Sequence, residues 1–232
     1  MTPTQLTNVN GEDYTKLIPS SAESLYLANP NKKEAVKYMN KGLKELGVSK
    51  FSFKILSDDT DAGNKTTEDL QSNFESTFGD KVSVSVQNLP FKTRLSRSTA
   101  GNFDIVVSGW SADFADPISF LDLLTKSNAY NYGKWESTAY NKNVSLSKTT
   151  GSTPTCWKAM VAAERAMLED QGVTVTPLYY TNEAPPASRA LNSGYFSLLV
   201  NLELSKAWKS SIMKKRLDAD ELLKMCFTKK FF

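Results

Sequence analysis

Residues 103–121 read FDIVVSGWSADFADPISFL, and this stretch carries the features that predict the fold and the site of the chain. The apolar, β-branched run Phe103–Val107 has the length of a buried strand, and Gly109 can end that strand by allowing a sharp change of direction. Two carboxylates, Asp113 and Asp116, follow among aromatic and small residues. Ligand sites often lie at the end of such a strand, so we expect one here.

The two carboxylates allow different interpretations. Asp116 precedes Pro117, which suits the first position of a helix beginning near Ile118, so its side chain is predicted to cap that helix. Asp113 lies three residues earlier, next to Phe114, and both capping and ligand contact are open for it. A charge beside a central strand is costly unless a cation or several donors meet it, so a ligand contact would involve a positive group.

Length and composition are those of a protein with its own hydrophobic core. The chain has 232 residues, 40% of them hydrophobic and 23% charged, enough for one large domain or two small ones. No apolar run approaches the roughly 20 residues that span a bilayer. The first residues lack the basic start and apolar core of a signal peptide, so we expect a cytoplasmic protein or part of a longer one.

Several classes of function are excluded by missing residue types. Histidine is absent, which removes the commonest general base and the commonest zinc ligand. Cys156 and Cys226 are 70 residues apart and form no metal-binding motif, and no glycine-rich phosphate-binding motif occurs. The formal net charge of +3 is too small and too mixed to indicate nucleic acid. We therefore predict no catalytic residues, no metal, no cofactor and no nucleic-acid partner.

Helix and strand patterns alternate along the chain, which predicts the α/β class with an open sheet and crossover connections. Helical spacing covers 29–47, about 66–79, 118–124 and 157–169, with a further short basic helix near 89–98. Strand patterns cover 51–56, 82–86, 103–107 and 173–180, the last containing Pro177 and therefore expected near an edge or a domain crossing. Ser57–Lys65 and Ser145–Thr155 are predicted to be a loop and a linker.

Three segments resemble the second lobe of the bacterial oligopeptide-binding proteins, the extracellular solute-binding components of ABC importers. They are Asn88–Leu124, Asn131–Asn141 and Ala166–Tyr180. The resemblance implies a periplasmic-binding-protein-like lobe with an open mixed sheet flanked by helices. We accordingly expect an irregular lead-in over 1–28, a peptide-binding lobe over 29–180 and a divergent basic tail over 181–232.

The resemblance also implies which residues bind the ligand. The acid of the family's G-W-x-A-D-[YF] motif pairs with the N-terminal ammonium of a peptide and falls here on Asp113. Trp110 would form part of the pocket wall, although burial in the core is an alternative for this residue. Gly109, Ala112 and Phe114 complete the predicted ligand-binding set.

The implied function is peptide binding as the solute-binding component of an ABC-type oligopeptide importer, or as a remnant of one. The partners would be short peptides and, through the full-length form, the membrane permease. The family acts at the extracellular face of the membrane or in the periplasm. Its members are normally longer than this chain and begin with a secretion or lipoprotein signal, so we expect a truncated relative. The alternatives are a surface or interaction protein that uses the lobe as a scaffold, and a non-functional gene fragment.

Overall fold

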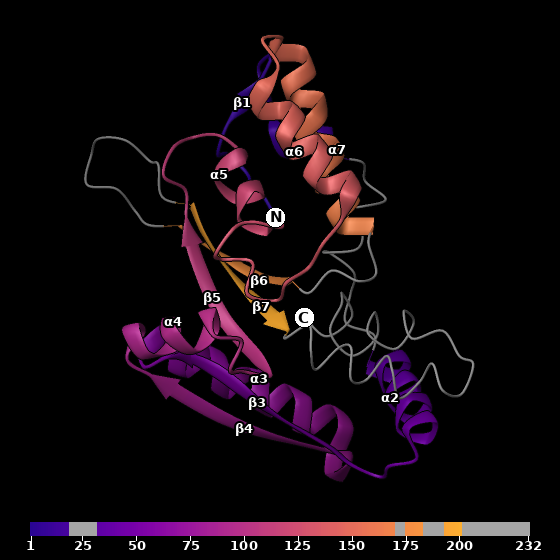
Figure 1. Cartoon of the computed structure of the whole chain (residues 1–232). Helices are drawn as coiled ribbons and strands as arrows, with labels where there is room; N and C mark the ends of the chain where they lie inside the picture. The colour runs from indigo at the N-terminus through magenta and orange to yellow at the C-terminus, as the bar shows by residue number, and fades with distance from the viewer. Residues whose placement is uncertain (19–31, 170–174, 183–192, 201–232) are drawn as a thin grey trace. The chain divides into compact units, whose positions relative to one another are not determined.

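The structure is a computed structural model and describes residues 1–18, 32–169, 175–182 and 193–200 (Figure 1). The chain divides into two compact units. One comprises residues 1–27, 109–173 and 177–197, and the other residues 28–108, 174–176 and 198–232. The domain boundary predicted at residue 28 and most of the predicted tail 181–232 lie outside the described residues, so that division of the chain stays a prediction.

The second unit holds two whole strands of a five-stranded sheet, whose parallel pairs confirm the α/β class. Strands β3 (Phe51–Asp58) and β4 (Val82–Leu89) pair in parallel along their whole length, and β3 also pairs in parallel with β5 (Ile105–Ser111). The order of strands is β4-β3-β5-β7-β6, with β6 at Val175–Asn182 and β7 at Ser193–Val200. Strand β6, which contains Pro177, lies at an edge, as a proline in a strand predicts.

Three helices of this unit alternate with its strands along the chain. They are α2 (Lys32–Leu46), α3 (Asp61–Phe78) and α4 (Phe91–Thr99). Helix α3 packs on β3 and β4 and buries Leu70, Phe74 and Phe78, the stripe expected from their spacing. The ring of Phe74 meets that of Phe53 on β3 edge to face, with 5.1 Å between centroids.

Helix α3 begins at Asp61, so the predicted loop Ser57–Lys65 and the predicted start near Thr66 are wrong. The hydroxyl of Thr60 accepts a hydrogen bond of 3.1 Å from the backbone N–H of Gly63 and caps the helix. Asp, Asn and Gly favour loops, but they are also common around helix starts, and composition does not distinguish the two.

Apart from the end of β5 and most of β6 and β7, helices and short elements form the described part of the first unit (Figure 1). In chain order these are β1 (Asn8–Val9), β2 (Glu12–Asp13), η1 (Tyr14–Leu17), α5 (Ile118–Leu121), η3 (Asp122–Leu124), α6 (Thr138–Thr149) and α7 (Thr153–Glu169). Helices α6 and α7 pack against each other, and α7 also contacts α5. The helix expected over 118–124 is present, with a 3₁₀ turn as its last part.

The linker predicted over Ser145–Thr155 is wrong, because α6 continues to Thr149 and α7 begins at Thr153 rather than at Trp157. Serine and threonine lower helix propensity by competing for backbone groups. Here Ser147 and Thr149 instead donate from their hydroxyls to carbonyls of their own helix, at 2.8 and 3.0 Å. Such back-bonding is compatible with a continuous helix.

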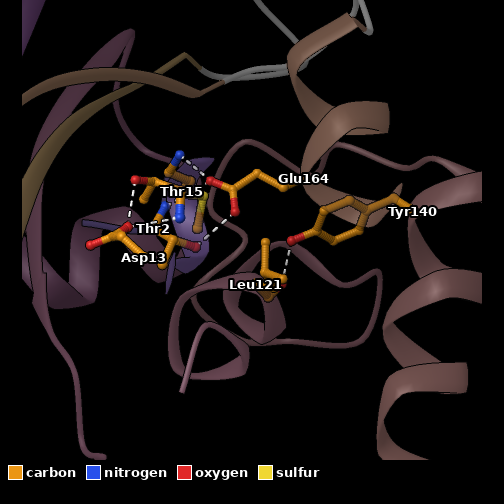
Figure 2. Close-up of polar contacts among 7 residues, drawn as sticks. Thr2, Asp13, Thr15, Leu121, Tyr140 and Glu164 are labelled. Carbon is orange, nitrogen blue, oxygen red and sulfur yellow. Dashed lines mark hydrogen bonds and ion pairs between the residues drawn. The ribbon is translucent and has the colours of Figure 1, made fainter. Parts of the chain in front are cut away.

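A polar cluster joins the first residues of the chain to α7 (Figure 2). The side chain of Glu164 is fully buried and accepts from the ammonium of Met1 at 2.5 Å and from the backbone N–H and hydroxyl of Thr2, both at 2.8 Å. Nearby in the same unit, the hydroxyl of Tyr140 on α6 donates to the carbonyl of Leu121 on α5. The cluster satisfies a charge that would otherwise be too costly to bury.

Candidate functional site

The predicted site lies where β5 leads into α5, but β5 does not end where the sequence predicted. The strand covers Ile105–Ser111, so Gly109 and Trp110 lie within it instead of forming a break after Val107. Glycine has no side chain to clash in an extended conformation, so it does not by itself end a strand. Gly109 is exposed and Trp110 is half-buried in the last part of this strand.

A compact turn over residues 112–117 follows β5 and is held by Asp116. The carboxylate of Asp116 accepts a hydrogen bond from the backbone N–H of Ile118 at 2.9 Å. The backbone carbonyl of Asp116 accepts another from the N–H of Ser119 at 3.0 Å. Pro117 has helical backbone angles directly before α5. The capping role predicted for Asp116 is therefore confirmed.

Asp113 lies in the same turn and differs from Asp116 in its contacts. Its backbone N–H donates to the hydroxyl of Ser119 at 3.0 Å, and Ser119 is buried, so the main chain at Asp113 is fixed. Its side chain is exposed, and its carboxylate has no hydrogen bond or ion pair with any residue that the structure describes. The side chain of Asp113 therefore does not cap α5, which was one of the two interpretations open for this residue.

The remaining predicted site residues differ in accessibility. Ala112 is buried, at 8% of its full exposure, and has little surface to offer a ligand, whereas Phe114 is 51% exposed. Among the described residues, no three metal-ligating side chains come close enough to hold an ion, and no helix there is both long and apolar enough to cross a membrane.

Trp110 has an aromatic partner that the sequence did not predict. The rings of Trp110 and Tyr130 meet edge to face, with 4.8 Å between centroids and 61° between planes, and Tyr130 in turn contacts Tyr132 at 6.1 Å. The indole Nε1 of Trp110 is buried and has no hydrogen-bond partner in the described part of the chain. Tyr130 itself is 42% exposed.

The loop that carries Tyr130 is ordered by two asparagines. The side chain of Asn128 accepts from the backbone N–H of Tyr130 at 2.9 Å. Asn131 is buried, accepts from the N–H of Trp135 at 3.1 Å and donates to the Trp135 carbonyl at 2.7 Å. The asparagines and tyrosines of residues 128–132 were the sequence signal for this aromatic loop. Local spacing could not predict that Tyr130 contacts Trp110, because twenty positions of the chain lie between them.

The chain was compared with known proteins, and one family model matches more than half of it. The model describes the bacterial extracellular solute-binding proteins, family 5 Middle, and it matches residues 5–132. The chain belongs to the family-5 bacterial extracellular solute-binding proteins. The resemblance found in the sequence motifs is thereby confirmed.

Individual relatives of this family-5 chain carry the names of peptide-binding proteins. The dipeptide-binding protein of Lactococcus lactis subsp. cremoris is 35% identical over 144 residues, which are 60% of this chain and 24% of that protein. The oligopeptide-binding protein OppA of Bacillus subtilis is 28% identical and is matched by 67% of this chain over 29% of its own length. The chain thus spans about a quarter of the length of these curated relatives.

Solved structures give the same assignment for the fold of the family-5 chain. A crystal structure described as a peptide ABC transporter, peptide-binding protein, has a TM-score of 0.62 and 36% identity, with 72% of each chain covered. Listeria monocytogenes OppA bound to peptide has a TM-score of 0.59 and 27% identity, covering 86% of this chain and 34% of that one. These relatives are named for binding and transport rather than for catalysis.

Proposed function

We propose that this chain binds short peptides by their free amino terminus, as part of the solute-binding component of an ABC peptide importer. Membership of family 5 and the names of the relatives support the class of ligand. The membrane permease belongs to the proposal as the partner of the full-length form, because one similar structure is described as the peptide-binding protein of a peptide ABC transporter.

The observation that carries the proposal is the contrast between Asp113 and Asp116. Both carboxylates lie in one turn, yet only that of Asp116 is engaged with the main chain. The backbone of Asp113 is fixed through Ser119 while its carboxylate stays exposed. A carboxylate held in this way can accept from the three donors of an ammonium group, each charge-assisted bond contributing about 1.5 to 3 kcal/mol.

The other predicted residues take supporting roles in this proposal. Half-buried Trp110 and exposed Phe114 would offer apolar surface beside the amine, while Gly109 and Ala112 keep the approach to the main chain free of bulk. Backbone pairing to an extended peptide would then supply affinity with little demand on its sequence. No nucleic acid, metal or cofactor has a role.

The proposal is tested by isothermal titration calorimetry with a pool of di- to pentapeptides, half of it N-acetylated. Free peptides are expected to bind at least tenfold more tightly than acetylated ones, because acetylation removes the charge and two donors. Asp113→Asn should abolish this difference. Asp80→Asn removes the same charge from an exposed position in the other unit and should leave it unchanged. Equal binding of free and acetylated peptides would refute the assignment of Asp113.

No observation favours an interaction scaffold as a second function. The basic residues of 206–232, on which that alternative depends, lie outside the described residues.

A further inference from the structure

Strand β4 lies at one edge of the sheet, where half of its backbone groups have no neighbouring strand (Figure 1). In a parallel ladder the N–H and C=O of one residue point to the same side, and successive residues alternate between sides. The carbonyl of Leu89 accepts from the N–H of Asp59, which directly follows β3, at 3.0 Å. The odd-numbered residues of β4 therefore face β3, and the even-numbered ones face away from the sheet.

Two side chains of α3 bind the outward backbone groups of Val84. Nε2 of Gln71 donates to the Val84 carbonyl at 2.8 Å, and the Val84 N–H donates to Oε1 of Glu75 at 3.3 Å. Gln71 and Glu75 are one helical turn apart, and Nε2 of Gln71 also lies 3.5 Å from Oε1 of Glu75. The backbone of Val84 is thus satisfied although no strand pairs with it on this side.

The remaining outward groups of β4 differ in occupancy. The N–H of Val82 donates to the carbonyl of Gly79 in the 3₁₀ turn η2 (Gly79–Lys81). The backbone groups of Val86 and Asn88 have no partner on the outward side among the described residues. A free strand edge is a template for pairing with another chain, most of all when the strand is uncharged and rich in β-branched residues. The sequence of β4 is VSVSVQNL, without a charge.

The spacing of the outward residues allows two copies of β4 to pair antiparallel about a twofold axis. With the axis at Ser85, Val84 of each copy faces Val86 of the other, and Val82 faces Asn88. All outward residues are paired in this register. With the axis at Val86, Val84 still faces Asn88 of the other copy. Both registers require the backbone groups of Val84 that Gln71 and Glu75 already bind.

A third register would use only the open end of the strand and is opposed by charge. With the axis at Gln87, Val86 of each copy would face Asn88 of the other. Nη1 of Arg97 on α4 donates to Oε1 of Gln87 at 2.8 Å. The two Gln87 side chains would lie opposite each other across the strands, which would bring the two guanidinium groups together. Like charges in this position destabilise strand pairing.

We propose that Gln71 and Glu75 prevent β4 from pairing with the β4 of a second copy of this chain. Removal of the two side chains turns the strand edge into a homodimer interface. A second copy is the partner because it brings the same uncharged strand, whose outward residues match in the register about Ser85. The function of the pair is to keep the second unit monomeric, as edge protection does in other sheets.

The test is sedimentation velocity of the full chain over a range of concentrations. Gln71→Ala/Glu75→Ala removes both groups while keeping good helix formers in α3. It should form dimers at a concentration at least about tenfold below any at which the unmodified chain does. Glu68→Ala/Asn73→Ala removes one carboxylate and one amide from exposed positions of the same helix and should stay monomeric.

A further substitution tests the register. Ser85 is exposed, so Ser85→Lys places a charge at the twofold axis without burying it. Added to Gln71→Ala/Glu75→Ala, it should restore the monomer, because two ammonium groups would face each other. The proposal is wrong if Gln71→Ala/Glu75→Ala stays monomeric, if Ser85→Lys leaves its dimer intact, or if the unmodified chain already dimerises as tightly.

Amide hydrogen exchange of the unmodified chain tests the same contact without any variant. Relative to their intrinsic rates, the N–H of Val84 should exchange at least about tenfold more slowly than that of Val86, because only the first has an acceptor. This measurement decides the question if Gln71→Ala/Glu75→Ala fails to fold. Equal exchange of the two amides would show that Glu75 does not hold the strand edge.

Discussion

Arg94 donates two hydrogen bonds to Asp58, from Nε to Oδ1 at 2.9 Å and from Nη2 to Oδ2 at 3.1 Å. Asp58 is the last residue of β3, and Arg94 lies in α4, which follows the neighbouring strand β4. The arginine side chain is buried and also lies over the ring of Phe91 at 5.1 Å. The pair therefore joins a strand end to the helix of the next crossover in the second unit.

The geometry of this pair predicts that lysine in place of Arg94 will not preserve the stability of the fold. A lysine ammonium cannot make the two parallel bonds, so Arg94→Lys should lower the free energy of unfolding by about 1.5 to 3 kcal/mol. Urea unfolding followed by circular dichroism measures the change. Lys92→Arg, at an exposed position of the same helix, should change it by less than about 0.5 kcal/mol. Similar values for the two variants would show that the paired geometry contributes nothing.

Gly63 is predicted to resist replacement by alanine, against the usual preference of helices. A Cβ at this position would lie 2.4 Å from the carbonyl oxygen of Asp58 and 3.1 Å from the hydroxyl of Thr60. Alanine normally stabilises a helix by about 1 kcal/mol over glycine, but here the start of α3 would have to move away from β3. Gly63→Ala should therefore lower the melting temperature.

The control for this prediction is Gly151→Ala. A Cβ there meets nothing within 4 Å, and no positive φ is recorded for that residue. Its effect on the melting temperature should be neutral or slightly stabilising. A gain in stability from Gly63→Ala would mean that the backbone near Asp58 yields easily.

Substitutions of Asp113 and Asp116 are expected to have different effects, with Asp116 contributing to stability and Asp113 to peptide binding. Asp116→Ala removes the acceptor for the N–H of Ile118 and should lower the free energy of unfolding by about 0.5 to 2 kcal/mol. Asp113→Ala removes a side chain without a partner in the described structure and should change it by less than about 0.5 kcal/mol. Chemical denaturation of both variants, with the peptide titration beside it, makes the comparison. The reverse order of the two stability losses would overturn the roles assigned here.

Glu164 should make the stability of the chain depend on pH. Burial raises the pKa of its carboxyl group, but the charge of the Met1 ammonium and the hydrogen bonds from Met1 and Thr2 outweigh this, so its pKa is lowered from the ordinary value of 4.5. Since the folded state holds the proton less tightly than the unfolded state, this contribution is complete above that ordinary value. It is lost as the pH falls through the lowered pKa of the folded state.

Glu164→Gln tests this assignment. At neutral pH the substitution should cost about 3 to 5 kcal/mol, because it leaves the buried ammonium without a counter-ion. Urea unfolding repeated from about pH 7 to about pH 3 should show the difference from the unsubstituted chain narrowing on acidification. Glu12→Gln, at an exposed position in the same unit, serves as the control. A difference that stayed constant over this range would assign the loss to packing rather than to charge.

The sequence predicted best those elements whose apolar residues recur at a regular spacing. The buried stripe of α3 and the paired strands β3 and β4 follow from side chains that must all face one core. The predictions failed where they were based on composition instead of spacing. These were the loop predicted over Ser57–Lys65 and the linker predicted over Ser145–Thr155. There Thr60, Ser147 and Thr149 use their hydroxyls to satisfy helical backbone groups. Residues typical of loops are therefore compatible with helices at these positions.

The sequence by itself determined the α/β class, the family motif around Asp113 and the capping role of Asp116, because these depend on residues close together in the chain. Only the tertiary structure decided that the Asp113 carboxylate stays free of the described residues, that Tyr130 meets Trp110, and that Glu164 holds the first two residues. These relationships join positions far apart in the sequence or depend on which donors come within hydrogen-bonding distance. Side-chain chemistry determines what each residue can bind, whereas chain folding determines what it meets.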